Sequence, residues 1–442
     1  MFLSLRLQTR KVTMYQTRYF STKPNYEEFL TATSKNRKPS AIRALQHYLD
    51  KPGTISLGGG MPNASTFPIK GILVELSQAC GGGTVAIKNP TDAFQYSATA
   101  GMPDLVKLLK ELQTYEHGMQ NPDIQITTGS QDALTKAFEM LLGPEDTLLV
   151  EDYTYSGSLT FLRGLKSKLK SIETDNEGII PDSLAKILSE WDHTVSKKPQ
   201  VLYTIPTGSN PTGITTPENR KREIYSICCE HNLLLLEDDP YYYLQFKENR
   251  VKSFSSIDKY GRVLRFDSLS KIISSGLRLG FASGPKPLVE RLNLHMQSTS
   301  LHTSGVSQAV TLALFENWRQ NEINPFEGFN GHVRRICYFY EEQLNTCVAL
   351  AQELLSPHAT FDVPQAGMFL WLELKSGTDS RIVAEELVKK DSVLVVPGSE
   401  FDPMQGSRKS PFIRISYSTA SPEQMKRAFT KVAARLKLLE SA

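Results

Sequence analysis

One lysine, Lys271, follows two serines in the stretch "DSLSKIISSGLRLG", which spans residues 267–280. A lysine in apolar surroundings loses solvation, so we expect it either to be exposed or to take part in chemistry. Ser268 and Ser270 precede it, and Arg278 follows between two glycines. Hydroxyl groups, a guanidinium and closely approaching backbone are the groups that bind a phosphate monoester. The stretch therefore predicts a lysine beside a phosphate site.

A second anion-binding pattern occurs in "TGSQDA", which spans residues 128–133 and contains Ser130 and Gln131. It stands at the start of a predicted helix, where free N–H groups and the helix dipole favour a phosphate. A lysine that must lose its proton to attack a carbonyl, placed next to a phosphate, indicates an imine with a phosphorylated aldehyde. The aldehyde of this kind that enzymes use is pyridoxal 5'-phosphate.

Five further residues have the side chains that this cofactor and its substrate need. Asp238 leaves an apolar strand in "LLLLEDDPYYY" and could keep the pyridine nitrogen protonated, while Tyr241 and Asn210 of "SNPTG" could bond the phenolic oxygen. Tyr155 is of the right kind to stack on the ring. Arg414 in "PFIRISYS" could hold a substrate carboxylate with two parallel hydrogen bonds.

The elements that must position these side chains alternate along the chain. From residue 56, apolar strand-like runs are each followed by a helical pattern, which predicts an α/β fold with a mostly parallel central sheet. Ligands of such sheets bind outside the carboxyl ends of the strands, where the candidate residues fall. After about residue 316 the pattern becomes a long helix, alternating strands and a final helix capped by Ser421, which predicts a smaller α+β domain.

Each feature by itself also has an ordinary structural explanation. A Ser-x-Ser-Lys stretch is usually a surface turn, "NPTG" is usually a loop, and an arginine in a strand usually pairs with an acid. Asp238 could cap a helix, and Tyr155 could belong to the core. The functional interpretation depends on their occurrence together, in one order, at successive strand ends.

The sequence resembles the class I, fold-type I pyridoxal-phosphate aminotransferases, and among them the 2-aminoadipate/kynurenine aminotransferase II group. The resemblance covers residues 25–440 and includes "KPSAIRAL", "ISLGGGMPN", "FQYSATAG", "TTGSQDAL", "EDDPYYYLQF", "DSLSKIISSGLRLGF" and "AGMFLW". It implies a large cofactor-binding domain over residues 56–316, and a small domain formed by residues 26–55 and 317–442.

The resemblance also implies roles for individual residues. Lys271 would be the Schiff-base lysine, with Asp238 on the pyridine nitrogen and Tyr241 and Asn210 on the phenolic oxygen. Tyr155 would stack on the ring, and Arg414 would bind the substrate carboxylate. The phosphate would be held by Ser130, Gln131, Ser268, Ser270 and Arg278. Tyr96 would reach the phosphate in the partner subunit's site, which implies a homodimer with shared active sites, and Arg43 and Gly60 would lie near the substrate side chain.

Two points remain open at this stage. Asp239 and Tyr242 have the same three-residue spacing as Asp238 and Tyr241, which we prefer because the distance along the chain to Lys271 matches the family. The stretch 77–93 departs from the family pattern.

Composition and termini limit the class of protein. A net charge of +3 gives no reason to expect nucleic acid as a partner, and the longest apolar run, at residues 233–236, is too short for a membrane span. The five cysteines lack metal-type spacing, so no metal is expected.

Residues 1–25 contain five basic and no acidic residues, which is typical of a mitochondrial presequence that would direct the protein to the matrix. A disordered basic tail on a cytoplasmic protein is the alternative.

The sequence thus predicts an aminotransferase that moves an amino group from 2-aminoadipate, kynurenine or aromatic amino acids to 2-oxoglutarate by a ping-pong mechanism. Its partners would be small amino acids and 2-oxo acids. Two alternatives are a transcription regulator with an aminotransferase-like domain, and a pyridoxal-phosphate enzyme with another reaction such as β-elimination. The first is disfavoured because about 25 residues before the homologous region are too few for a DNA-binding domain.

Overall fold

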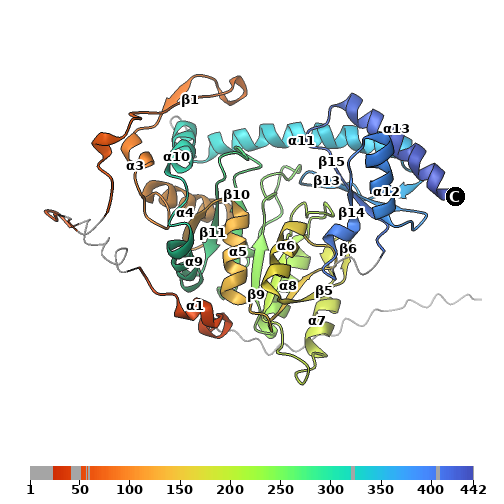
Figure 1. Ribbon diagram of the computed structural model, residues 1–442, viewed down its shortest axis with the longest axis horizontal. Helices are drawn as coiled ribbons and strands as arrows, with labels where there is room; N and C mark the ends of the chain where they lie inside the picture. Colours follow the sequence, from red (N-terminus) through yellow and green to blue (C-terminus); the bar gives the residue numbers. More distant parts are fainter. Residues whose placement is uncertain are drawn as a thin grey trace, which may run out of the picture.

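A seven-stranded sheet forms the centre of the protein, as seen in a computed structural model that describes residues 23–40, 51–55, 57, 60–319, 324–404 and 409–441 (Figure 1). In spatial order the strands are β3 (Asp123–Thr127), β11 (Gly280–Gly284), β10 (Val263–Ser268), β9 (Leu234–Asp238), β8 (Val201–Thr204), β4 (Thr147–Glu151) and β5 (Lys168–Ile172). The strands are parallel except β11, which runs antiparallel to both of its neighbours. The predicted mostly parallel sheet is therefore confirmed.

The two faces of this sheet carry separate hydrophobic cores, and strand alternation assigns side chains to them. On β9, Leu234 and Leu236 belong to one core, whereas Leu235, together with Leu233 just before the strand, belongs to the other. Burial on both faces explains why the sequence of β9 is a continuous apolar run rather than an alternating one.

Helices cover both faces. The first core takes residues from α4 (Pro103–His117), α5 (Ser130–Leu141), α6 (Ser156–Leu165) and α9 (Lys286–Thr299), and the second from α7 (Pro181–Ser189) and α8 (Glu218–Glu230). Helix α10 (Gly305–Arg319) packs against α4 and α3 (Pro90–Phe94). Two short hairpins complete this part: β1 (Leu73–Glu75) with β2 (Thr84–Ala86), and β6 (Thr174–Asp175) with β7 (Gly178–Ile179).

A second, four-stranded sheet has its own core. Its spatial order is β12 (Ala359–Thr360), β13 (Phe369–Leu374), β15 (Phe412–Ser416) and β14 (Val396–Pro397), and it packs with α12 (Ser380–Glu386) and α13 (Pro422–Glu440). Ser421 caps α13, as the sequence predicted, and Gln424 completes a capping box with it. The long helix α11 (Glu327–Leu354) contributes Phe329 and Val333 to the first core and Leu344 and Cys347 to the core of this sheet (Figure 1).

The N-terminal segment differs from its predicted place. Tyr26 and Phe29 of η1 (Tyr26–Phe29) belong to the core of the seven-stranded sheet, and the Tyr26 hydroxyl donates to the Gly261 carbonyl at 2.8 Å. Helix α1 (Ala32–Asn36) packs on α5. Residues 26–36 therefore pack against the seven-stranded sheet and its helices, whereas the sequence had assigned the stretch 26–55 to the small domain. Tyr26 and Phe29 pack in the core of that sheet, and the order of apolar and polar residues in this short segment does not indicate which domain they join.

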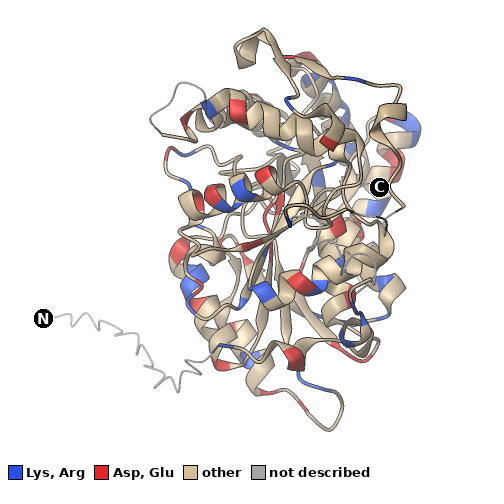
Figure 2. Cartoon of the chain, turned by 90° about the vertical axis from the view of Figure 1, so that its left-hand side faces the viewer, with Lys and Arg blue, Asp and Glu red and all other residues tan. Residues whose placement is uncertain are grey.

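Acidic and basic side chains are interspersed over the covering helices (Figure 2). Within the described residues, no helix is both long and apolar enough to cross a membrane, and no three His, Cys, Asp or Glu side chains gather in a possible metal site. The predicted presequence falls largely in residues 1–22, outside the described residues.

Candidate active site

A cavity of about 370 Å³ lies at the carboxyl ends of the parallel strands and extends to the second sheet. Nearly all the residues selected from the sequence line it: Ser130, Gln131, Tyr155, Asn210, Asp238, Tyr241, Ser268, Ser270, Lys271, Arg278 and Arg414. The structure brings them together because each stands at or just after a strand end or, for Arg414, on β15 of the second sheet. The structure thus places these side chains around one cavity.

At one end of the cavity the chain forms an anion cradle. Helix α5 begins at Ser130, after Gly129 with a φ of 77°. A Cβ atom at Gly129 would lie 2.6 Å from the guanidinium of Arg278, so only glycine lets Arg278 approach the free N–H groups of this helix. Arg278 donates to the Ser270 hydroxyl at 3.2 Å. The cradle has the positive charge, hydroxyl groups and helix terminus that a phosphate requires.

Lys271 lies beside this cradle in a turn after β10. Burial lowers its pKa, and the nearby Arg278 charge lowers it further. Both effects favour the neutral amine, which is the form that attacks a carbonyl.

Asp238 is the last residue of β9, and its side chain is buried among polar groups. Its Oδ2 accepts a hydrogen bond of 2.9 Å from the Tyr203 hydroxyl, while its buried Oδ1 has no partner within the protein. Burial raises the pKa of Asp238 to about 7; the charges of Asp239 and Asp267 raise it as well, and Arg265 and the Tyr203 hydrogen bond oppose the rise. A cationic pyridinium N–H would satisfy the free oxygen and stabilise the carboxylate.

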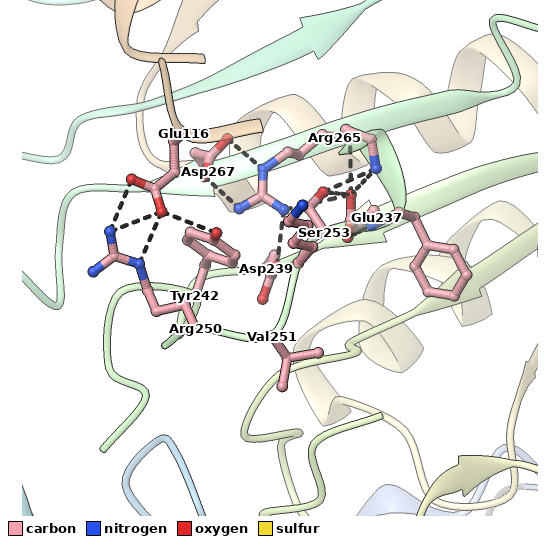
Figure 3. Close-up of polar contacts among 12 residues, drawn as sticks. Glu116, Glu237, Asp239, Tyr242, Arg250, Val251, Ser253, Arg265 and Asp267 are labelled. Carbon is pink, nitrogen blue, oxygen red and sulfur yellow. Dashed lines mark hydrogen bonds and ion pairs between the residues drawn. The ribbon is translucent and has the colours of Figure 1, made fainter. Parts of the chain in front are cut away.

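Strand alternation distinguishes the two adjacent carboxylates that the sequence left open. Asp238 and Tyr241 line the cavity, whereas Asp239 pairs with Arg265 at 2.8 Å on the other face of the sheet. The Tyr242 hydroxyl donates to Glu116 at 3.0 Å, also away from the cavity (Figure 3). The geometry thus favours the Asp238/Tyr241 pair.

Arg414 of β15 also lines the cavity and joins the two sheets. Its Nη1 donates to the Asn210 side-chain oxygen at 2.7 Å, and its guanidinium lies 4.3 Å from the centre of the Phe369 ring and 5.0 Å from that of Phe401. Its Nε is buried and has no partner. An arginine held between aromatic rings with an unused donor can bind a carboxylate.

The chain segments that lead to Asn210 and to Phe369 approach each other closely. Gly208, with a φ of 51°, lies against Gly367, with a φ of 84°. A Cβ on Gly208 would be 2.8 Å from the backbone of Ala366 and Gly367, so bare backbone is needed on both sides.

Two predicted site residues that the structure describes do not line the cavity. Tyr96 is 53% exposed, with its ring edge-on to His302, and Gly60 is exposed with nothing within 4 Å of a built Cβ. Arg43 lies outside the described residues. Sequence reasoning in turn missed Ile205, Pro240, Ser275 and Phe369 of the lining, and also Tyr203 behind Asp238. Phe369 belongs to the quoted motif "AGMFLW", so it could have been found; Tyr203 carries no such signal.

The chain matches the family described as aminotransferase class I and II over residues 66–432. It is 41% identical to kynurenine/alpha-aminoadipate aminotransferase, mitochondrial, of Bos taurus, over 93% of this chain and 99% of that one. It is 30% identical to an aromatic amino acid aminotransferase of Dictyostelium discoideum, over 93% of this chain and 88% of that one. The protein therefore belongs to the class I and II aminotransferases.

A solved structure extends the comparison to the cofactor. LysN, the alpha-aminoadipate aminotransferase of Thermus thermophilus, superposes with a TM-score of 0.72 at 25% identity, covering 95% of this chain and all of that one. It is complexed with N-(5'-phosphopyridoxyl)-L-leucine. The cradle, Lys271 and the free oxygen of Asp238 fit the same group. The protein is a fold-type I transaminase that uses pyridoxal 5'-phosphate and acts on amino acids and 2-oxo acids.

Proposed function

We propose that the protein transfers the amino group of 2-aminoadipate, kynurenine or aromatic amino acids to 2-oxoglutarate in two successive half-reactions. The observation that carries the proposal is that one cavity is lined by Lys271, by the residues of the phosphate cradle, and by Arg414 hydrogen-bonded to Asn210. The names of the bovine and Dictyostelium relatives support the choice of donors.

In this mechanism Arg414 and Asn210 hold the α-carboxylate of the amino acid, which directs its α-carbon toward Lys271. The cradle of Ser130, Gln131, Ser268, Ser270 and Arg278 anchors the cofactor phosphate, and Tyr155 covers the ring. The bound cofactor supplies an aldehyde that accepts the amino group and a ring that stores the electron pair of the broken Cα–H bond.

Two residues then act on protons. Lys271, as a neutral amine, takes the proton from the substrate α-carbon and delivers it to the C4′ carbon of the cofactor. Asp238 holds the proton of the pyridine nitrogen, and Tyr241 and Asn210 orient the ring through its phenolic oxygen. Water supplies the oxo oxygen of the 2-oxo acid as it leaves, and 2-oxoglutarate enters by the same contacts to reverse these steps.

The remaining parts of the proposal concern assembly and location. Tyr96 contributes to the site of a partner subunit in a homodimer, which accounts for an exposed tyrosine at a family motif. Arg43 and Gly60 lie near the substrate side chain. The basic N-terminus directs the protein to the mitochondrial matrix, in line with the mitochondrial names of the bovine, mouse and rat relatives.

A panel of amino donors with 2-oxoglutarate, following both products, tests the proposal. Formation of glutamate together with the matching 2-oxo acid from 2-aminoadipate, kynurenine or an aromatic amino acid supports it. Formation of ammonia and an eliminated side chain instead would show that the enzyme uses a different pyridoxal-phosphate reaction on these substrates.

A further inference from the structure

A buried group of charged side chains lies behind the active site, on the face of the sheet that the cavity does not use. Arg265 of β10 is its centre, and its side chain is fully buried together with those of Glu237 and Asp239. Asp267 is almost fully buried as well. Charges taken out of water are stable only when they are closely paired, so this group has a fixed geometry.

The guanidinium of Arg265 reaches both strand ends at once (Figure 3). Its Nε and Nη2 donate to the two oxygens of Asp267 at 3.0 and 2.9 Å. Its Nη1 donates to Asp239 at 2.8 Å and lies 3.4 Å from Glu237. Arg265 therefore joins the end of β10 to the end of β9 through side chains on one face.

Asp238 and Ser268, which are sequence neighbours of these carboxylates, face the cofactor cavity. Asp238 stands between Glu237 and Asp239 on β9, and Ser268 follows Asp267 on β10. The parallel register pairs Arg265 with Glu237 and Phe266 with Asp238. Since side chains alternate between faces, any displacement of Asp239 or Asp267 behind the sheet is transmitted to Asp238 and Ser268 in front of it.

We propose that Arg265 is a positioning residue for the transaminase reaction: by joining Asp239 to Asp267 it fixes the separation of Asp238 and Ser268, which hold the pyridine ring and the phosphate of the cofactor. The inference rests on the roles proposed above for Asp238 and Ser268. A lysine could not replace Arg265, because a single ammonium group cannot form the two parallel bonds to Asp267 and still reach Asp239.

The chain offers a matched pair that does not reach the strand ends. Arg250 forms the same kind of two-bond contact with Glu116, both bonds at 2.8 Å. It also lies over Tyr242, 5.8 Å from the ring centre, as Arg265 does at 4.8 Å. Arg250→Lys thus removes a two-bond contact of the same kind, although a partly buried one, without touching the strand ends behind the cofactor.

The test compares Arg265→Lys, Arg250→Lys and Asp238→Asn. For each apoenzyme, the melting temperature and the dissociation constant of pyridoxamine 5'-phosphate are measured, the latter by calorimetry. Both arginine variants should lower the melting temperature. Of the two arginine variants, only Arg265→Lys should raise the dissociation constant of the cofactor. The increase should be roughly tenfold, which corresponds to about one charge-assisted hydrogen bond. With saturating cofactor, Arg265→Lys should lower kcat and leave KM for the amino acid nearly unchanged, because Arg414 lies on the other sheet.

Equal cofactor affinity in Arg265→Lys and Arg250→Lys would overturn the inference. Unchanged affinity in Asp238→Asn would instead overturn the role proposed for Asp238, which separates the two failures. If Arg265→Lys does not fold, Asp267→Asn takes its place with Glu116→Gln as the control. Asp267→Asn keeps the size of the side chain but leaves one oxygen for the two donors, so it should weaken cofactor binding more than Glu116→Gln, and equal binding would refute the proposal.

Discussion

Arg414→Lys is the sharpest test of how the substrate is held. In the structure the guanidinium is fixed by Asn210 at 2.7 Å and by the Phe369 ring at 4.3 Å, and its Nε is buried without a partner. A lysine keeps the positive charge but offers a point charge in place of two parallel donors.

The expected loss follows from one missing hydrogen bond to a charged group. Such a bond contributes about 1.5 to 3 kcal/mol, which at about 1.4 kcal/mol per factor of ten lowers kcat/KM roughly 10- to 150-fold. Because every amino acid and 2-oxo acid carries the same carboxylate, the loss should be similar for all donors and acceptors. Cofactor affinity should not change, since the substitution leaves every residue of the phosphate cradle in place.

Steady-state kinetics over several donors, with calorimetry of cofactor binding, measure both quantities. Arg381→Lys is the control, because Arg381 pairs with Asp379 on the exposed surface of α12. A loss confined to donors with one type of side chain would place Arg414 near that side chain, and unchanged kinetics would leave it with a structural role only.

Four further outcomes are expected. Lys271→Ala should remain folded but lose multiple turnover and the visible absorption of the lysine-bound cofactor; normal turnover would exclude Lys271 as the proton carrier. Asp238→Asn should slow proton abstraction by roughly two orders of magnitude if about 3 kcal/mol of the lost charge pairing acts on the transition state, measured by single-turnover kinetics; a normal rate would contradict the pyridine contact. Mixing Tyr96→Phe with Lys271→Ala subunits should give more activity than the sum of the parents, since hybrid dimers would hold one intact site; simple additivity would place Tyr96 in its own subunit's site. Burial raises the pKa of Glu151 to about 7 from an ordinary value of 4.5, so the folded apoenzyme binds more protons than the unfolded chain in this range and should lose stability as pH rises. Glu151→Gln should flatten the curve of unfolding free energy against pH by up to roughly 3 kcal/mol, as measured by urea denaturation, and an unaltered slope would contradict the raised pKa.

Most of the fold and most of the site residues could be predicted because they are encoded locally. Strand β9 is apolar because both its faces are buried. Glu237 and Asp238 interrupt the apolar run, so the end of the strand can be recognised in the sequence. Lys271 and Arg278 stand in one short stretch, so their proximity required no tertiary information.

What the sequence did not reveal depends on contacts between distant segments. Asp238 and Asp239 are chemically identical, and although the family spacing favours Asp238, the physical difference between them is that Asp239 lies on the side of the sheet where it pairs with Arg265. Likewise, Tyr26 packs beside Gly261, 235 residues away, so the attachment of the N-terminal segment to the large sheet has no local signal. The reversed direction of β11 is a property of the chain path and not of its composition.

The contact between Gly208 and Gly367 limits how this enzyme can be redesigned. The two glycines belong to chain segments that lead to Asn210 and to Phe369. A methyl group at either glycine would push these segments apart and displace the Asn210 side chain from Arg414, with which it is proposed to hold the substrate carboxylate. Changes of donor preference are therefore best sought among the side chains that line the cavity rather than at these two glycines.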